Sequence, residues 1–140
     1  LLDYKVMAEN DSLYNTPPTF GIYMISKVTE YLRNDIGGLD KMEAINRKKA
    51  ETLYNAIDGS GGFYIGHARK ESRSLMNITF VLQNKELDGA FTKEAEAAGL
   101  EGLPGHRSVG GFRASIYNAL TQDSVDTLVS FMKEFQAKNG

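Results

Sequence analysis

The segment Gly102–Ala119, GLPGHRSVGGFRASIYNA, holds the side chains of this sequence that are best suited to bind an anion. His106 and Arg107 are adjacent in a glycine-rich stretch, and Arg113 follows shortly after them. A guanidinium can bind a carboxylate or a phosphate through two hydrogen bonds, and an imidazole can add a donor or a charge. Glycines let the backbone approach a ligand closely. The spacing therefore predicts an anion-binding cluster of His106, Arg107 and Arg113.

Arg113 also fits a role that involves no ligand. The segment FRASIY alternates apolar and polar residues, which predicts a strand with one buried face. The apolar face would hold Phe112, Ala114 and Ile116. Arg113 then lies on the opposite face, where an arginine is most often simply solvated. Spacing alone leaves both roles open.

A second candidate for anion binding is YNTPPTF, which spans Tyr14–Phe20. Proline is tolerated in the first turn of a helix, so we expect a helix to start here with Asn15 or Thr16 as its N-cap. The positive end of a helix also suits a phosphate. Local considerations favour the plain cap, but a cap made by one of these side chains leaves the other free.

Composition argues against several other kinds of site. The 140 residues include no cysteine, which excludes disulfides, thiolate metal sites and cysteine nucleophiles. The two histidines, His67 and His106, are far apart in the sequence, so no metal site is expected. A net charge of −2 does not favour nucleic acid as a partner. No apolar run is long enough to span a bilayer and no signal-peptide pattern opens the sequence, so we expect a cytoplasmic protein without a membrane partner.

Hydrophobic periodicity predicts a mixed α+β chain with an antiparallel sheet and helices packed on one side of it. A first helix is expected to end at Gly37-Gly38. NRKKAE would form the solvated face of the next helix, and HARKESRS would be an exposed loop. DGSGGFYIG lacks the lysine of a nucleotide-binding loop and is expected to be a turn. The later elements are predicted as helices at about 39–57, 87–98 and 124–137 and strands at 74–82 and 112–117.

Together, YNTPPTFGIYM and GHRSVGGFRASIYNAL resemble the phosphoserine aminotransferase family, in the same order and at a similar separation. These are class V aminotransferases, pyridoxal-phosphate enzymes of fold type I. GGLDKMEAINRKKAETLYNAID, between the two motifs, resembles the family's long inter-domain helix. The resemblance covers essentially the whole chain and implies the C-terminal portion of such an enzyme. The first methionine is Met7, which also indicates part of a longer protein.

The resemblance implies a domain plan. Residues 1–38 would belong to the large-domain and dimer-interface region, and residues 39–60 would form the connecting helix. Residues 61–140 would be the small C-terminal α+β domain, so two helices lead from this domain to a large domain that the sequence lacks. The implied protein partners are that N-terminal large domain and a second subunit of a homodimer.

The family pattern also implies roles for the candidate residues. Asn15 and Thr16 would contact the phosphate of pyridoxal 5'-phosphate across the dimer interface, in the partner's active site. His106 and Arg107 would meet the distal phosphate or carboxylate of the substrate, and Arg113 would hold its α-carboxylate. The implied reaction passes an amino group between glutamate and 3-phosphohydroxypyruvate, giving 2-oxoglutarate and O-phosphoserine. This is a step of L-serine biosynthesis, and family members can also serve pyridoxine biosynthesis.

No catalytic residue is expected within this chain. The reaction needs a lysine that forms a Schiff base with the cofactor, an acidic partner for the pyridine nitrogen and an aromatic side chain stacked on the ring. In the family all three lie in the N-terminal domain, and no lysine here has a matching sequence context. The 140 residues alone are therefore expected to be inactive, and the full-length protein to be an aminotransferase.

Two alternatives stay open at this point. The first is another class V aminotransferase, such as one of the alanine–glyoxylate type. The adjacent His106 and Arg107 argue against it, because a small uncharged side chain needs no second anion contact. The second is a non-enzymatic, small α+β interaction domain.

Overall fold

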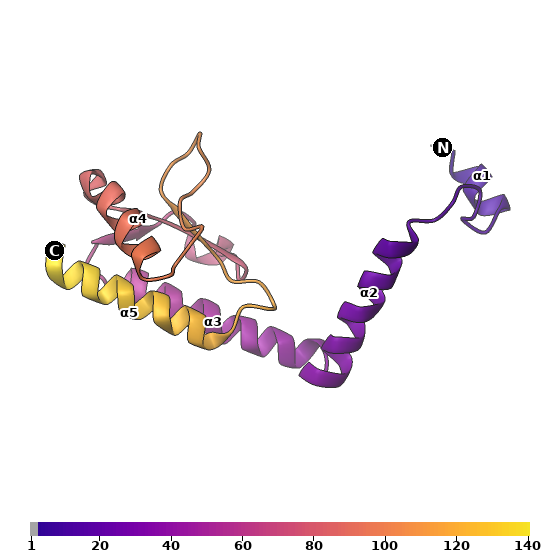
Figure 1. The fold of residues 1–140 in the computed structure, drawn as a ribbon, viewed down its shortest axis with the longest axis horizontal. Helices are drawn as coiled ribbons and strands as arrows, with labels where there is room; N and C mark the ends of the chain where they lie inside the picture. Colours follow the sequence, from indigo (N-terminus) through magenta and orange to yellow (C-terminus); the bar gives the residue numbers. More distant parts are fainter. Residues whose placement is uncertain (1–2) are drawn as a thin grey trace. The chain divides into compact units, whose positions relative to one another are not determined.

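The computed structural model describes residues 3–140, which form two compact units, one ending at Leu39 and one running from Asp40 to Gly140. The first unit is helical: α1 (Tyr4–Glu9) is followed by α2 (Thr19–Tyr31) and by a single π-helical turn, η1 (Leu32–Ile36) (Figure 1). Gly37 ends this helix with a left-handed backbone, φ 88°, as the glycine pair predicts.

The start of α2 differs from the prediction. Its N-cap is Pro18, with no side-chain cap hydrogen bond, so neither Asn15 nor Thr16 caps the helix. A proline disfavours the helical conformation in the residue before it. Two consecutive prolines therefore keep Thr16 and Pro17 outside the helix, which begins only after the second. Asn15 and Thr16 stay in the exposed segment that precedes α2.

The apolar side chains of α2 are exposed. Within residues 3–39 no side chain is buried, and Phe20 is 76% exposed. The other large apolar side chains exposed on this helix are Ile22, Tyr23, Met24, Ile25, Val28 and Tyr31. Exposed apolar side chains gathered on one helix are typical of an interaction surface.

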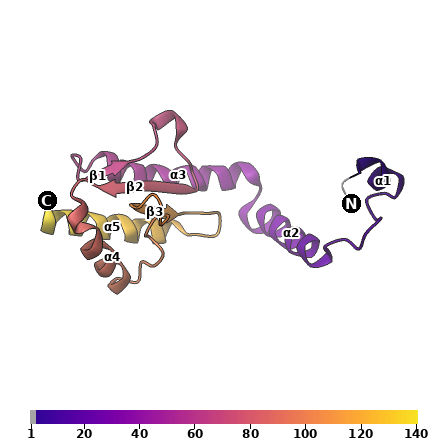
Figure 2. The same cartoon turned by 90° about the horizontal axis from the view of Figure 1, so that it is seen from above.

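The second unit is an α+β domain, as the sequence predicts. Its elements are α3 (Leu39–Asp58), β1 (Tyr64–Gly66), η2 (Lys70–Ser72), β2 (Asn77–Leu82), η3 (Lys85–Leu87), α4 (Asp88–Ala97), β3 (Phe112–Ser115) and α5 (Gln122–Asn139). Figure 2 shows β2 between β1 and β3, and both pairings are antiparallel. The strand β1 lies within DGSGGFYIG, which was predicted to be a turn. The sequence did not reveal this strand because three residues are too few to display an alternation.

One face of the sheet packs with α3, α4 and α5 in a single core. The strand predicted at 74–82 is confirmed as β2, in which Ile78, Phe80 and Leu82 are buried. Phe91 of α4 lies at the centre of the core, with its ring centroid 4.6 Å from that of Phe112. Burying each such aromatic side chain stabilises the fold by about 1.5–3 kcal/mol.

The face of α3 that was predicted to be solvated contains a fully buried lysine. The Lys49 ammonium donates hydrogen bonds to the carbonyls of Ile116, Tyr117 and Leu120 at 3.1, 2.7 and 2.9 Å. These residues connect β3 to α5, and the Tyr117 carbonyl also accepts from the Leu120 amide at 3.0 Å. Burial lowers the pKa of Lys49, whereas three carbonyl acceptors favour its charged form. The prediction of a solvated face was therefore wrong at this position.

Asn46, one turn before Lys49, is buried as well. Its side-chain amide donates to the Asn118 side chain at 2.9 Å. Two polar side chains of α3 thus hold the connection between β3 and α5 against the helix.

No helix within residues 3–140 combines the length and the apolar character needed to cross a membrane.

We predict that Lys49→Met lowers the free energy of unfolding by about 2–4 kcal/mol, because the Ile116 and Leu120 carbonyls lose the donor that Lys49 supplies. Denaturant melts of the variant and the wild type measure this difference. Lys48 is exposed on the same helix and serves as the control. Lys48→Met should change stability by no more than about 0.5 kcal/mol. Equal stabilities for the two variants would contradict the role given to Lys49.

Candidate functional site

The loop at residues 103–113, coloured orange in Figure 1 where it precedes β3, is closed by backbone hydrogen bonds. The Gly105 amide donates to the Gly111 carbonyl at 2.8 Å, and the Arg113 amide donates to the Leu103 carbonyl at 2.7 Å. The two limbs of the loop therefore continue the antiparallel pairing beyond the sheet. This pairing fixes the orientation of the loop where it leads into β3.

The tip of the loop is a tight turn that orients His106. The His106 carbonyl accepts hydrogen bonds from the amides of Val109 and Gly110 at 2.9 and 2.8 Å. Its ring Nδ1 lies 2.7 Å from the Ser108 hydroxyl and accepts from the Ser108 amide at 3.3 Å. This hydrogen-bond pattern assigns the ring proton to Nε2. The exposed imidazole therefore offers an N–H donor to a ligand.

Two glycines are needed for the loop to close. A Cβ on Gly111 would lie 2.9 Å from the Phe80 carbonyl oxygen, and the residue has φ 67°. A Cβ on Gly105 would lie 2.5 Å from the Gly110 carbonyl oxygen. These glycines serve close backbone contacts within the protein, in addition to any approach of a ligand.

A cavity of about 310 Å³ lies over the outer face of the sheet and is bordered by His67, His106 and Arg113. Thr79 and Val81 of β2 also line it, and Thr79 is the register partner of Arg113. This volume is within the range of small-molecule sites. None of the residues that line the cavity is acidic.

The structure brings together two of the three residues that the sequence predicted as a cluster. His106 and Arg113 border the same cavity, and Arg113 lies on the outer face of β3 as predicted. Arg107 is exposed in the same loop but lies outside the cavity lining. Within residues 3–140, neither Arg107 nor Arg113 forms an ion pair with an acidic side chain. Both charges are therefore available to an anion.

His67 is the residue at this site that sequence reasoning missed. It follows directly after β1, and its amide donates to the Thr79 carbonyl at 3.3 Å. That pairing carries the side chain toward the cavity shared with Arg113. The missing signal was β1 itself, because without that strand His67 is only part of an exposed basic loop.

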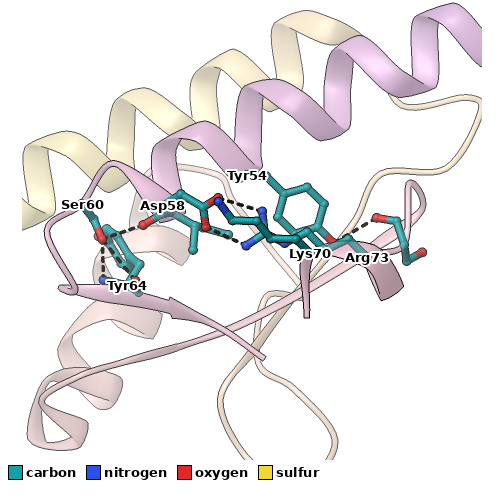
Figure 3. A network of polar contacts seen from close by, with 8 residues as sticks. Tyr54, Asp58, Ser60, Tyr64, Lys70 and Arg73 are labelled. Carbon is teal, nitrogen blue, oxygen red and sulfur yellow. Dashed lines mark hydrogen bonds and ion pairs between the residues drawn. The ribbon is translucent and has the colours of Figure 1, made fainter. Parts of the chain in front are cut away.

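Side-chain contacts join the loop that follows His67 to the C-terminal part of α3 (Figure 3). Arg73 donates two hydrogen bonds to the Asp58 carboxylate, at 2.8 and 2.6 Å, and its guanidinium lies 4.3 Å from the centre of the Tyr54 ring. The Tyr54 hydroxyl donates to the Ser74 carbonyl at 3.0 Å. The bonds from Arg73 hold the pKa of the Asp58 carboxyl below its usual value. The prediction of an exposed loop was wrong for Arg73, whose side chain is 16% exposed.

Arg113 also borders a second cavity, of about 350 Å³, between β3 and the start of α5. Arg113 is the only basic residue in its lining, and Glu101 adds a negative charge. The cavity with two histidines is therefore the better candidate for an anion.

Asn15 and Thr16 lie in the first unit, in the segment between α1 and α2. Both are exposed, and neither side chain forms a hydrogen bond within the part of the chain that the structure describes. Their amide and hydroxyl donors are therefore available. Among residues 3–140, no three His, Cys, Asp or Glu side chains are grouped to hold a metal ion.

The sequence model of the family described as Aminotransferase class-V matches residues 1–128. The chain belongs to the class-V aminotransferase family. It is 56% identical over 140 residues to the phosphoserine aminotransferase of Herpetosiphon aurantiacus and 58% identical over 139 residues to that of Campylobacter jejuni. These alignments cover 100% and 99% of this chain but only 39% and 38% of the two relatives. The chain thus spans about two fifths of the length of these class-V relatives.

Solved structures of class-V aminotransferases confirm the α+β fold. The phosphoserine aminotransferase of Bacillus circulans subsp. alkalophilus matches with a TM-score of 0.89 and 52% identity, over 98% of this chain and 38% of that one. The phosphoserine aminotransferase of Trichomonas vaginalis, solved with PLP bound, matches with a TM-score of 0.81 and 39% identity, over 94% of this chain and 37% of that one.

We predict that Gly111→Ala lowers the free energy of unfolding by about 1–3 kcal/mol, because the new Cβ meets the β2 backbone and the residue keeps a positive φ. Gly89 of α4 has open space around it and serves as the control. Gly89→Ala should raise stability by up to about 1 kcal/mol, as expected for alanine within a helix. Denaturant melts test both variants, and a fully stable Gly111→Ala protein would contradict the close contact.

Proposed function

We propose that this chain is the C-terminal portion of a phosphoserine aminotransferase. The enzyme would use pyridoxal phosphate to pass an amino group between glutamate and 3-phosphohydroxypyruvate, giving 2-oxoglutarate and O-phosphoserine. The main support is the convergence of His106 and Arg113 on one cavity free of acidic side chains. Relatives that bear this name align over essentially the whole chain.

Both amino-acid substrates carry two anionic ends, and the candidate residues suit both. Arg113 would hold the α-carboxylate, since a guanidinium matches a carboxylate through two parallel hydrogen bonds. His106 would donate its Nε2–H to the distal phosphate or carboxylate, and the unpaired charge of Arg107 would neutralise that group. An arginine at each end gives the substrate one orientation relative to the bond that reacts.

Asn15 and Thr16 would hold the phosphate of the cofactor. An amide NH₂ and a hydroxyl are suitable donors to phosphate oxygens, and both side chains are exposed and unpaired in the described part of the chain. Following the family pattern, they would act across the interface of a homodimer, in the partner's active site. When bound, pyridoxal phosphate would supply the electron sink for the amino-transfer chemistry.

The remainder of the active site would come from an N-terminal large domain. In this plan residues 1–38 belong to the large-domain and dimer-interface region, residues 39–60 form the connecting helix and residues 61–140 form the small domain. The exposed apolar side chains of α2 support this plan, because the large domain or a second subunit would cover them. Lys49 is no substitute for the missing catalytic lysine, because backbone carbonyls occupy all three of its donors. We place the enzyme in the cytoplasm, in L-serine biosynthesis and, as a second pathway, in pyridoxine biosynthesis.

We predict that the full-length protein binds pyridoxal phosphate, turns yellow and converts O-phosphoserine and 2-oxoglutarate. The 140-residue chain alone should be inactive, because it lacks the lysine. Absorbance spectra and a coupled transamination assay measure both. A colourless full-length protein would rule out aminotransferase activity of any class V type and favour an interaction domain. A yellow protein that prefers alanine to O-phosphoserine would favour another class V activity.

We predict different substrate patterns for two arginine variants of the full-length enzyme. Arg113→Ala should weaken the reaction of every amino-acid substrate, because all carry the α-carboxylate. Arg107→Ala should impair O-phosphoserine and glutamate but spare alanine, which has no distal anion. Loss of one charged contact should cost about 2–4 kcal/mol in kcat/KM. A uniform loss across substrates for Arg107→Ala would contradict its assignment.

A further inference from the structure

We propose that His67 is a third side chain of the distal-anion site and that it favours a phosphate monoester over a carboxylate. This inference rests on the proposed function and adds a specificity residue to the same cavity. His67 follows directly after β1, so it comes from a different part of the chain than the glycine-rich loop and β3.

The sheet places His67 beside the two residues already assigned to the substrate. Gly66 is the register partner of Phe80. The next residue, His67, donates its amide to the Thr79 carbonyl, and Thr79 is the register partner of Arg113. Pairing across the sheet, from His67 through Thr79 to Arg113, therefore brings His67 to the cavity that Arg113 and His106 border.

The His67 side chain is available for a ligand. Its ring forms no hydrogen bond or ion pair within residues 3–140, and no acidic residue lines the cavity with it. The loop that continues from it is held by the two hydrogen bonds between Arg73 and Asp58. The backbone of His67 is thus bonded to β2, and its imidazole faces a cavity with two other cationic or donor groups.

The chemistry of the two substrates explains why a third group matters. A carboxylate has two oxygens, which the fork of one arginine can satisfy. A phosphate monoester has three terminal oxygens and up to two negative charges, so it needs more donors. Arg107 and the Nε2–H of His106 would serve the distal anion of either substrate, the phosphate of O-phosphoserine or the side-chain carboxylate of glutamate. The donor from His67 would serve the additional oxygen that only the phosphate has.

The test compares two half-reactions of the full-length enzyme, with O-phosphoserine and with glutamate, followed through the absorbance of the cofactor. His67→Ala should lower kcat/KM for O-phosphoserine by about tenfold, as expected for a lost hydrogen bond to a charged group, and change that for glutamate by less than about twofold. His67→Gln keeps an N–H donor of similar reach and should stay within about threefold of the wild type for both.

Arg69→Ala is the matched control, since Arg69 is exposed two residues away and does not line the cavity. It should leave both half-reactions unchanged. Calorimetric titration gives a second readout that needs no turnover. Inorganic phosphate should bind His67→Ala about tenfold more weakly than the wild type, whereas the affinity for acetate should be unaffected.

Three results would overturn the assignment of His67. These are no loss in His67→Ala, an equal loss for both substrates, or a loss in His67→Gln as large as that in His67→Ala. An equal loss would show that His67 only maintains the sheet. If the wild-type enzyme does not act on O-phosphoserine, the proposed function fails instead, and the phosphate titration alone then decides the role of His67.

Discussion

The arrangement of the second unit depends on the contact between the Lys49 ammonium and three backbone carbonyls. Ile116, Tyr117 and Leu120 lie where the chain leaves β3 and turns toward α5, and their carbonyls have no strand partner there. A buried ammonium is costly unless each of its donors is used, and here each is. The contact therefore joins α3 to the end of the strand that carries Arg113. The stability of the core and the placement of Arg113 therefore depend on one set of hydrogen bonds.

The candidate site is built on the opposite face of the same sheet. The inner face supplies Phe80 and Phe112 to the aromatic core, and the outer face presents Thr79 and Arg113 to the cavity. Because side chains alternate along a strand, a rigid core on one side holds the functional side chains on the other. The glycine-rich loop continues this geometry through its own backbone pairing. It is a structured extension of β3, and His106 gains its orientation from that structure.

The chain contains the cationic side chains of the proposed substrate site without the lysine that the proposed chemistry requires. This separation is consistent with a chain that spans about two fifths of its class-V relatives. It also agrees with the contrast between the two units, since the second has a dense core and the first has no buried side chain within residues 3–39. A helix with a broad apolar stripe and no core of its own gains stability only from a surface supplied elsewhere. The exposed apolar side chains of α2 are therefore the part of the first unit best suited to contact another protein segment.

Hydrophobic periodicity was enough to predict the helices and strands that are long enough to display it. The sequence also indicated the charged cluster around His106 and Arg113, because local alternation places Arg113 on the outer face without knowledge of the rest of the fold. The burial and the contacts of residues whose partners are distant in sequence depend on the packing of the elements, which local patterns do not reveal. The sequence pattern placed Lys49 on a solvated face, but its ammonium binds carbonyls beyond β3. The pattern placed His67 in an exposed loop, but the pairing of β1 with β2 brings it next to the sheet. The physical reason is that periodicity reports the side of an element on which a residue lies, whereas burial and shared cavities depend on the elements that pack against that side.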